Sequence, residues 1–91
     1  MEDAQGDFGE DSLWGCDLLA VHYGIRLSDA SHEDRPHLLA ALDKLVREVL
    51  QVRHPGMSAA EAIRVRTVVA ERARRTCAVL ERRTDAAAAA G

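Results

Sequence analysis

Arginine is the residue through which this chain could most readily bind a charged ligand, because a guanidinium group donates paired hydrogen bonds to carboxylates and phosphates. Seven of the eleven arginines fall within residues 58–83 of a 91-residue chain whose formal net charge is −3. Arg64, Arg75 and Arg82 share one side of the helix predicted there, but the other four point elsewhere, so no continuous basic stripe would follow a phosphate backbone. We therefore expect a solvated helix face first, a site for an acidic protein second and a nucleic-acid site third.

Residues able to perform catalysis or to bind a metal do not occur at the spacings that those tasks require. The sequence HEDRPH resembles a zinc motif, but His32 and His37 are five positions apart with Pro36 between them, so they do not share a helical face. The sequence has no nucleophile beside a base, no paired carboxylates in an apolar setting and no glycine-rich phosphate loop. No repeated ligand spacing occurs among the other candidates, which are Cys16, His22, His54 and Cys77. The sequence therefore predicts a non-enzymatic protein with no catalytic, cofactor or metal site.

The composition predicts an all-α fold. Hydrophobic residues make up 47% of the chain but aromatic residues only 3%, so the core must be aliphatic and rich in alanine. The β-branched residues are spaced singly along helical patterns and do not form short alternating runs, so we expect no β-sheet. A chain of 91 residues can hold one small core, whose stability is expected to be marginal.

The sequence also predicts the cellular setting. Two cysteines, Cys16 and Cys77, are too few for a secreted disulfide scaffold, and no charged segment followed by an apolar one precedes residue 12. The longest uninterrupted apolar run, residues 86–90, is far shorter than the roughly 20 residues that cross a bilayer. We expect a soluble cytoplasmic protein with free thiols and no membrane partner.

Three segments organise the chain. Residues 1–11 carry five acidic residues and no basic ones, so we expect a disordered acidic tail there, followed by a three-helix domain over 12–84 and a disordered alanine-rich tail over 85–91. The first helix is expected to begin at a cap near residue 12 and to end at Gly24, because glycine readily adopts the left-handed conformation that closes a helix. The apolar ridge expected to pack this helix consists of Trp14, Leu18, Val21 and Ile25.

Caps and breakers define the two longer helices. The second helix has Pro36 in its first turn and is expected to extend to about Val52. The third begins at a capping box formed by Ser58 and Glu61 and is expected to extend to about Arg83. At 1.5 Å per residue that helix is roughly 37 Å long, so its far half should project from the domain. The second helix is amphipathic along a row of leucine and valine residues, which are Leu38, Leu42, Leu45 and Val49, with Leu39, Val46 and Leu50 beside them.

The third helix carries two apolar ridges, which indicates two neighbours. The wider ridge comprises Ala62, Val65, Val69, Ala73, Thr76, Val79 and Leu80, and the narrower one comprises Ile63, Ala70 and Cys77. Together with a first helix that is apolar almost all round, these ridges exceed what three helices can bury. We therefore expect the protein to self-associate, as a homodimer, or to require a protein partner.

The distribution of charge also favours self-association. Residues 1–35 contain nine acids and two bases, for a net charge of −7, and residues 36–91 contain six acids and ten bases, for a net charge of +4. Opposite charges at the two ends of a molecule attract a second copy through complementary surfaces.

Arg72 is the arginine expected to contact a partner. It projects into the apolar face between Val69 and Val79, where its guanidinium needs either an acid or open solvent. We hypothesise that this acid lies across an interface with another chain. The predicted partner-binding residues are Trp14, Leu18, Arg72, Thr76, Val79 and Arg83.

The sequence thus favours a small non-enzymatic α-helical interaction module, either a homodimer or an adaptor subunit of a larger complex. The alternative is a small DNA-binding transcriptional regulator that uses the arginine-rich helix or residues 18–31. In that region Ala20, Gly24 and Ile25 match the small residue, turn glycine and following aliphatic residue of a helix-turn-helix. We do not expect a nucleic-acid partner, because the would-be recognition helix would carry the acids Asp29, Glu33 and Asp34.

The acidic segment at the start of the chain has a further interpretation. Phe8, Trp14 and Leu18 stand among acidic residues, which is similar in kind to activation peptides that fold into a partner's groove. An ordinary core helix with an acidic leader explains the same residues, and we favour it.

Overall fold

The protein is all-α in the computed structural model, which describes residues 13–90 and contains no strand within them. A single 3-10 turn, η1 (Leu13–Gly15), is followed by three α-helices, α2 (Asp17–Asp29), α3 (Arg35–Arg53) and α4 (Ala59–Ala90). This confirms the predicted fold class. The acidic tail, including Phe8, lies outside the described residues, so its predicted disorder and its likeness to activation peptides stay predictions.

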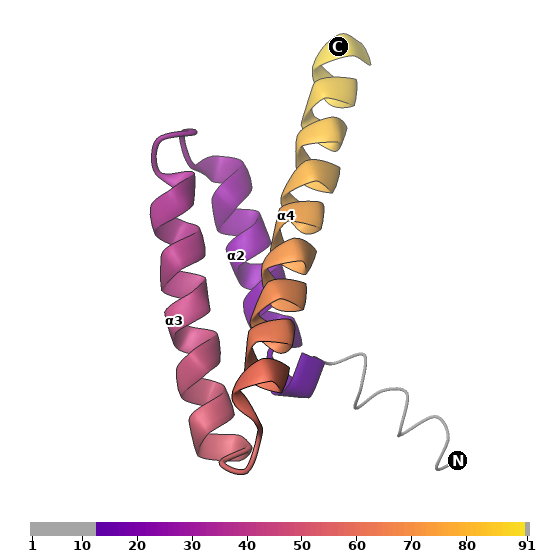
Figure 1. The fold of residues 1–91 in the computed structure, drawn as a ribbon. Helices are drawn as coiled ribbons and strands as arrows, with labels where there is room; N and C mark the ends of the chain where they lie inside the picture. Colours follow the sequence, from indigo (N-terminus) through magenta and orange to yellow (C-terminus); the bar gives the residue numbers. More distant parts are fainter. Residues whose placement is uncertain (1–12, 91) are drawn as a thin grey trace, which may run out of the picture.

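The three helices form a small bundle in which α2 and α4 run in the same direction and α3 runs against both (Figure 1). Two ion pairs mark the antiparallel order of α3 and α4, because Arg35 at the start of α3 binds Glu81 late in α4, whereas Asp43 binds Arg66 earlier in α4. The largest of the three helix interfaces lies between α2 and α4. The first helix therefore packs on a hairpin of the two longer ones, as the sequence predicted.

The core is small and aliphatic, and every helix contributes to it. The residues of α3 that face inward confirm the predicted amphipathic row and its neighbours, because Leu42, Val46 and Leu50 are buried. From α2 and the turn before it, the core receives Cys16, Ala20, Tyr23 and Leu27, and from α4 it receives Val65, Val69, Ala73 and Cys77.

Gly24 does not end a helix, and this corrects the predicted boundary. Helix α2 continues through it to Asp29, and Gly24 is buried against α4. A Cβ atom at this position would lie 2.5 Å from the Thr76 Cβ and 2.8 Å from the Ala73 carbonyl oxygen, distances that real Cβ atoms do not reach. Glycine is therefore needed here because two helix backbones approach closely, not because the backbone turns.

The face that α2 buries also differs from the predicted ridge. The buried residues are Ala20, Tyr23, Gly24 and Leu27, whereas the larger aliphatic residues of the predicted ridge remain at the surface. Ala20 and Gly24 allow α2 to approach α4 closely, and Tyr23 and Leu27 on the same side fill the core, so this side is buried in place of the predicted ridge.

The start of α2 is shaped by two residues with positive φ. Trp14 has φ 57° and Gly15 has φ 91°, so the chain kinks within η1 and α2 begins at Asp17 instead of near residue 12. Only glycine adopts such a conformation without steric cost, so Trp14 is a strained position that its surroundings must stabilise.

The two later helices begin largely as predicted. Pro36 lies in the first turn of α3, and the Glu61 backbone N–H donates a hydrogen bond of 3.1 Å to the Ser58 hydroxyl at the start of α4. A full capping box also requires the Glu61 carboxylate to accept a hydrogen bond from the Ser58 backbone N–H. Here this carboxylate instead accepts a hydrogen bond of 2.6 Å from Arg64. None of the helices among the described residues combines the length and the apolar composition needed to cross a bilayer.

The end of α4 was predicted incorrectly. The helix does not stop near Arg83 but continues to Ala90. Alanine has the highest helix propensity of any residue, and no glycine or proline interrupts the run before Gly91. At 1.5 Å per residue α4 is about 48 Å long against about 28 Å for α3, and its final turns extend beyond the other two helices (Figure 1).

Replacing Leu42 tests the position of α3. Leu42→Ala should lower the free energy of unfolding by about 2–5 kcal/mol, because it removes a buried side chain and leaves a cavity. Chemical denaturation followed by circular dichroism measures the change, and a loss within about 0.5 kcal/mol would show that Leu42 does not face the core.

Replacing Gly24 tests the close approach of α2 to α4. Gly24→Ala should destabilise the fold by about 1–3 kcal/mol, because the overpacking outweighs the gain in helix propensity of about 1 kcal/mol. Gly56→Ala is the matched control, since nothing lies within 4 Å of a Cβ there, and its effect should stay within about 0.5 kcal/mol. A stabilised Gly24→Ala protein would contradict the packing described above.

Candidate interaction surfaces

Arg72 has an acidic partner within its own chain. Its Nη1 donates a hydrogen bond of 3.2 Å to Oδ1 of Asp17, and the two side chains remain 38% and 40% exposed. The acid that the sequence analysis placed across an interface is therefore supplied by α2 of the same molecule. The ion pair joins α2 to α4 at the surface, where such a pair contributes little stability.

The Asp17–Arg72 pair places two rows of apolar residues side by side. Asp17 binds Arg72 and Gly24 lies against Thr76, so Val21, between Asp17 and Gly24 on α2, lies beside the stretch of α4 from Arg72 to Thr76. Ile25 directly follows Gly24 and is therefore near Thr76, and Val79 lies about one turn farther along α4.

An exposed apolar strip occupies the outer side of α2. Leu18, Val21 and Ile25, spaced three and four residues apart, are 81%, 37% and 46% exposed, and we call them the α2 strip. Next to it on α4, Thr76 and Val79 belong to a shallow, mainly apolar depression that is lined by Arg72, Arg75, Thr76, Val79 and Leu80. The α2 strip together with Thr76 and Val79 is called the α2–α4 surface.

Two of the six predicted partner-binding residues lie away from this surface. Trp14 is half-buried near the start of α4. The guanidinium carbon of Arg64 lies 5.8 Å from the centroid of the Trp14 ring. Arg83 is exposed on the part of α4 beyond the ion pair between Arg35 and Glu81. The fold thus places Arg72, Thr76 and Val79 in one depression and Leu18 next to Asp17, the partner of Arg72, whereas Trp14 and Arg83 lie toward opposite ends of α4.

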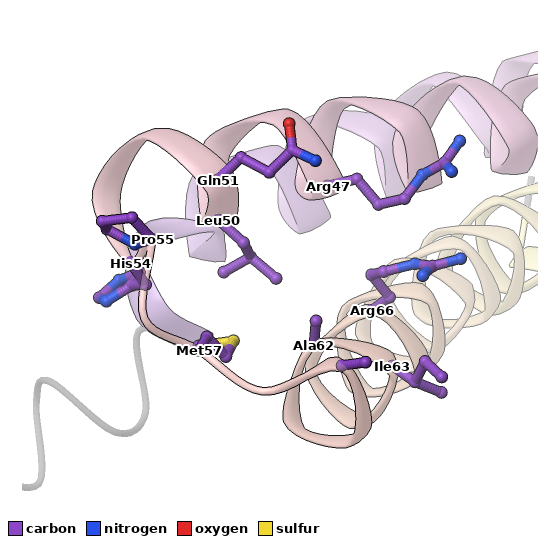
Figure 2. A pocket seen from close by; sticks show the side chains of 10 residues that line it. Arg47, Leu50, Gln51, His54, Pro55, Met57, Ala62, Ile63 and Arg66 are labelled. Atoms are coloured by element: carbon purple, nitrogen blue, oxygen red, sulfur yellow. The ribbon is translucent and has the colours of Figure 1, made fainter.

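A second concave surface, which the site prediction missed, lies between α3 and α4 (Figure 2). Leu50 and Ala62 face each other from the two helices, Ile63 lies 57% exposed at the edge, and Arg47 and Arg66 stand along one side. A neighbouring depression that shares Ile63 and Arg66 continues along the same helices and is lined by Leu39, Ala40, Asp43, Thr67, Ala70 and Arg74. We call the two together the α3–α4 groove. The narrow ridge of Ile63 and Ala70 was its signal in the sequence.

The charged side of the α3–α4 groove has an excess of arginine. The Asp43 carboxylate accepts hydrogen bonds of 2.7 and 3.0 Å from Nε and Nη2 of Arg66 and also lies 3.6 Å from Nε of Arg47. The hydrogen bond to Asp43 raises the pKa of Arg66, so this group stays charged. One carboxylate therefore serves two guanidinium groups, and with Arg74 the groove has a net charge of +2.

The two cysteine thiols form no disulfide and are unreactive. Cys16 and Cys77 are buried and unpaired, and burial raises the pKa of each thiol, although Arg53 and Arg35 respectively oppose this effect. Because the thiolate is the nucleophile and metal ligand, both groups are held in their unreactive form at neutral pH. Among residues 13–90 no three histidine, cysteine or acidic side chains come together as a metal site.

The helix-turn-helix suggested for residues 18–31 is not formed at its expected turn. A turn is required at Gly24, but α2 passes through this position as a continuous helix, and Ala20 and Gly24 face α4. The chain leaves helical geometry only after Asp29.

Comparison with known proteins returned no match to a family model, to a curated protein or to a solved structure.

A double-mutant cycle measures the contribution of the Asp17–Arg72 pair. The coupling energy from Asp17→Ala, Arg72→Ala and the double variant should be about 0.2–1 kcal/mol and should shrink in 1 M salt, because both side chains are partly solvated. Asp17→Ala combined with Arg75→Ala is the control, since the ion pairs described do not include Arg75, and it should show almost no coupling. A coupling near zero for Asp17 and Arg72 at low salt would contradict the pair.

Proposed function

We propose that the protein is a non-enzymatic helical interaction module that binds a helix of another chain through the α2–α4 surface. The observation that carries this proposal is the α2 strip, in which Leu18, Val21 and Ile25 remain exposed at helical spacing while α2 packs through its other side. An apolar stripe at this spacing is the pattern by which helices pack on one another.

The surroundings of the strip resemble the arrangement of a protein interface. Its apolar residues, with Thr76 and Val79 beside them, form a centre that Asp17, Arg72 and Arg75 border. An apolar centre with a charged border suits protein association, because burial of the centre supplies the free energy and the charges select the partner and its orientation.

A second copy of the chain is the partner we favour, as a homodimer or as a subunit within a larger complex. The opposite net charges of residues 1–35 and 36–91 support self-association. The free thiols of Cys16 and Cys77 are typical of a reducing compartment, and we propose the cytoplasm as the location.

A pair of matched substitutions tests this function. Leu18→Asp and Val52→Asp each place a carboxylate at an aliphatic residue that is about four-fifths exposed, but only Leu18 belongs to the α2–α4 surface. Sedimentation equilibrium at about 100 μM should give an average mass above one chain for the wild type and for Val52→Asp, and the monomer mass for Leu18→Asp, because a buried carboxylate opposes association. Circular dichroism should show equal helicity in all three.

Two results would contradict the proposal. The first is a cooperatively folded wild-type protein that is strictly monomeric at this concentration. The second is an equal loss of association in both variants. A salt-dependent shift of duplex DNA by the wild-type protein at physiological ionic strength would instead favour the DNA-binding alternative.

A further inference from the structure

We infer that the α3–α4 groove of one molecule receives the α2 strip of a second copy, so that the chains associate head to tail. This inference rests on the proposed function, because it names the surface that the α2 strip binds. The groove and the strip are two separate apolar features of the described residues, and both are open to solvent at Ile63 and Leu18.

The two features match in length. On α4 the groove extends from Ala59 to Arg74, which at 1.5 Å per residue is about 22 Å. Helix α2 has 13 residues and is therefore about 20 Å long. A helix of this length can lie along the groove with its apolar residues toward the floor.

The lining of the groove suits a helix with aliphatic side chains. Its apolar surface comes from Leu50, Met57 and Ile63, and alanine residues occupy both of its walls, namely Ala40, Ala59, Ala62 and Ala70. Small residues let a helix backbone approach closely, as they already do inside the molecule, where Ala73 lies against Gly24. Leucine, valine and isoleucine of the α2 strip would then contact the larger aliphatic groups of the groove.

The net charges of the two features are opposite. The groove has a net charge of +2, because Arg47, Arg66 and Arg74 outnumber Asp43. The segment from α2 through the turn after it carries one base, Arg26, against four acids, which are Asp17, Asp29, Glu33 and Asp34. Arg72 and Arg75, which border the strip on α4, reduce this net charge from −3 to −1 without reversing its sign. Complementary charges bring such surfaces together and disfavour contact between two grooves.

The positions of the two features require a head-to-tail contact. Ile63 of the groove and Arg72, which borders the α2 strip, are nine residues apart on α4 and therefore lie on opposite sides of that helix. One neighbour cannot occupy both sides, so each molecule donates its strip to one copy and accepts the strip of another. Such heterologous contacts produce open chains or closed rings, so of the two assemblies proposed above this arrangement selects the larger complex over the two-fold homodimer.

Complementation between two variants tests this arrangement. Leu18→Asp damages the strip and leaves the groove intact, whereas Ile63→Lys damages the groove, adds no acid to its basic side and leaves the strip intact. Sedimentation equilibrium at about 100 μM should show each variant alone as a monomer, and an equimolar mixture as a species of two chains, because one intact strip and one intact groove remain. The wild type should form species larger than two chains, and circular dichroism should show native helicity in both variants.

The outcomes separate this inference from the function on which it rests. If Ile63→Lys associates like the wild type while Leu18→Asp does not, the α2 strip binds a partner but the groove does not receive it, and the inference fails alone. A monomeric mixture of the two variants, or a wild-type protein that stops at two chains, would also overturn it. If the wild type is monomeric, both the inference and self-association fail. The control is a mixture of Val52→Asp and Ile63→Lys, since the strip and the groove of the Val52→Asp chain are both intact.

Discussion

The close approach of α2 and α4 at Gly24 is the contact on which the rest of the structure depends. Only a residue without a side chain fits between the α2 backbone and the Ala73 carbonyl and Thr76 side chain of α4. Because the helices meet at Gly24, the side of α2 that carries Gly24 faces the core, and Leu18 and Ile25 are left on the outer side of the bundle. The same contact that stabilises the fold therefore also produces its exposed apolar strip.

The arginines of α4 divide into structural and free groups along the helix. Arg64, Arg66 and Arg72 each pair with a carboxylate of the same chain, and Arg66 and Arg72 connect α4 to the other two helices. The ion pairs among the described residues do not include the later arginines, which are Arg74, Arg75, Arg82 and Arg83. Much of the basic character that first suggested phosphate binding is thus neutralised within the molecule, while the basic character of the groove and of the projecting end of α4 remains.

Both candidate surfaces follow from the small number of helices. Within residues 13–90, α2 covers the inner sides of α3 and α4, but no other helix covers the groove on their other side or the outer side of α2. In a larger bundle a fourth helix would occupy such a groove. Here the chain offers a helix of suitable length and charge on its own surface, which is the physical basis for the proposed assembly through copies of one protein.

The sequence by itself determined the fold class, the start of α3 and α4 and the inward row through Leu42, because periodicity, proline and capping residues act locally. Only the tertiary structure decided which side of α2 is buried, that Arg72 binds Asp17, and that α3 and α4 enclose a groove. A helical wheel ranks faces by hydrophobicity but contains no distance between helices. At Gly24 that distance mattered most, since two helix backbones approach so closely there that only glycine fits.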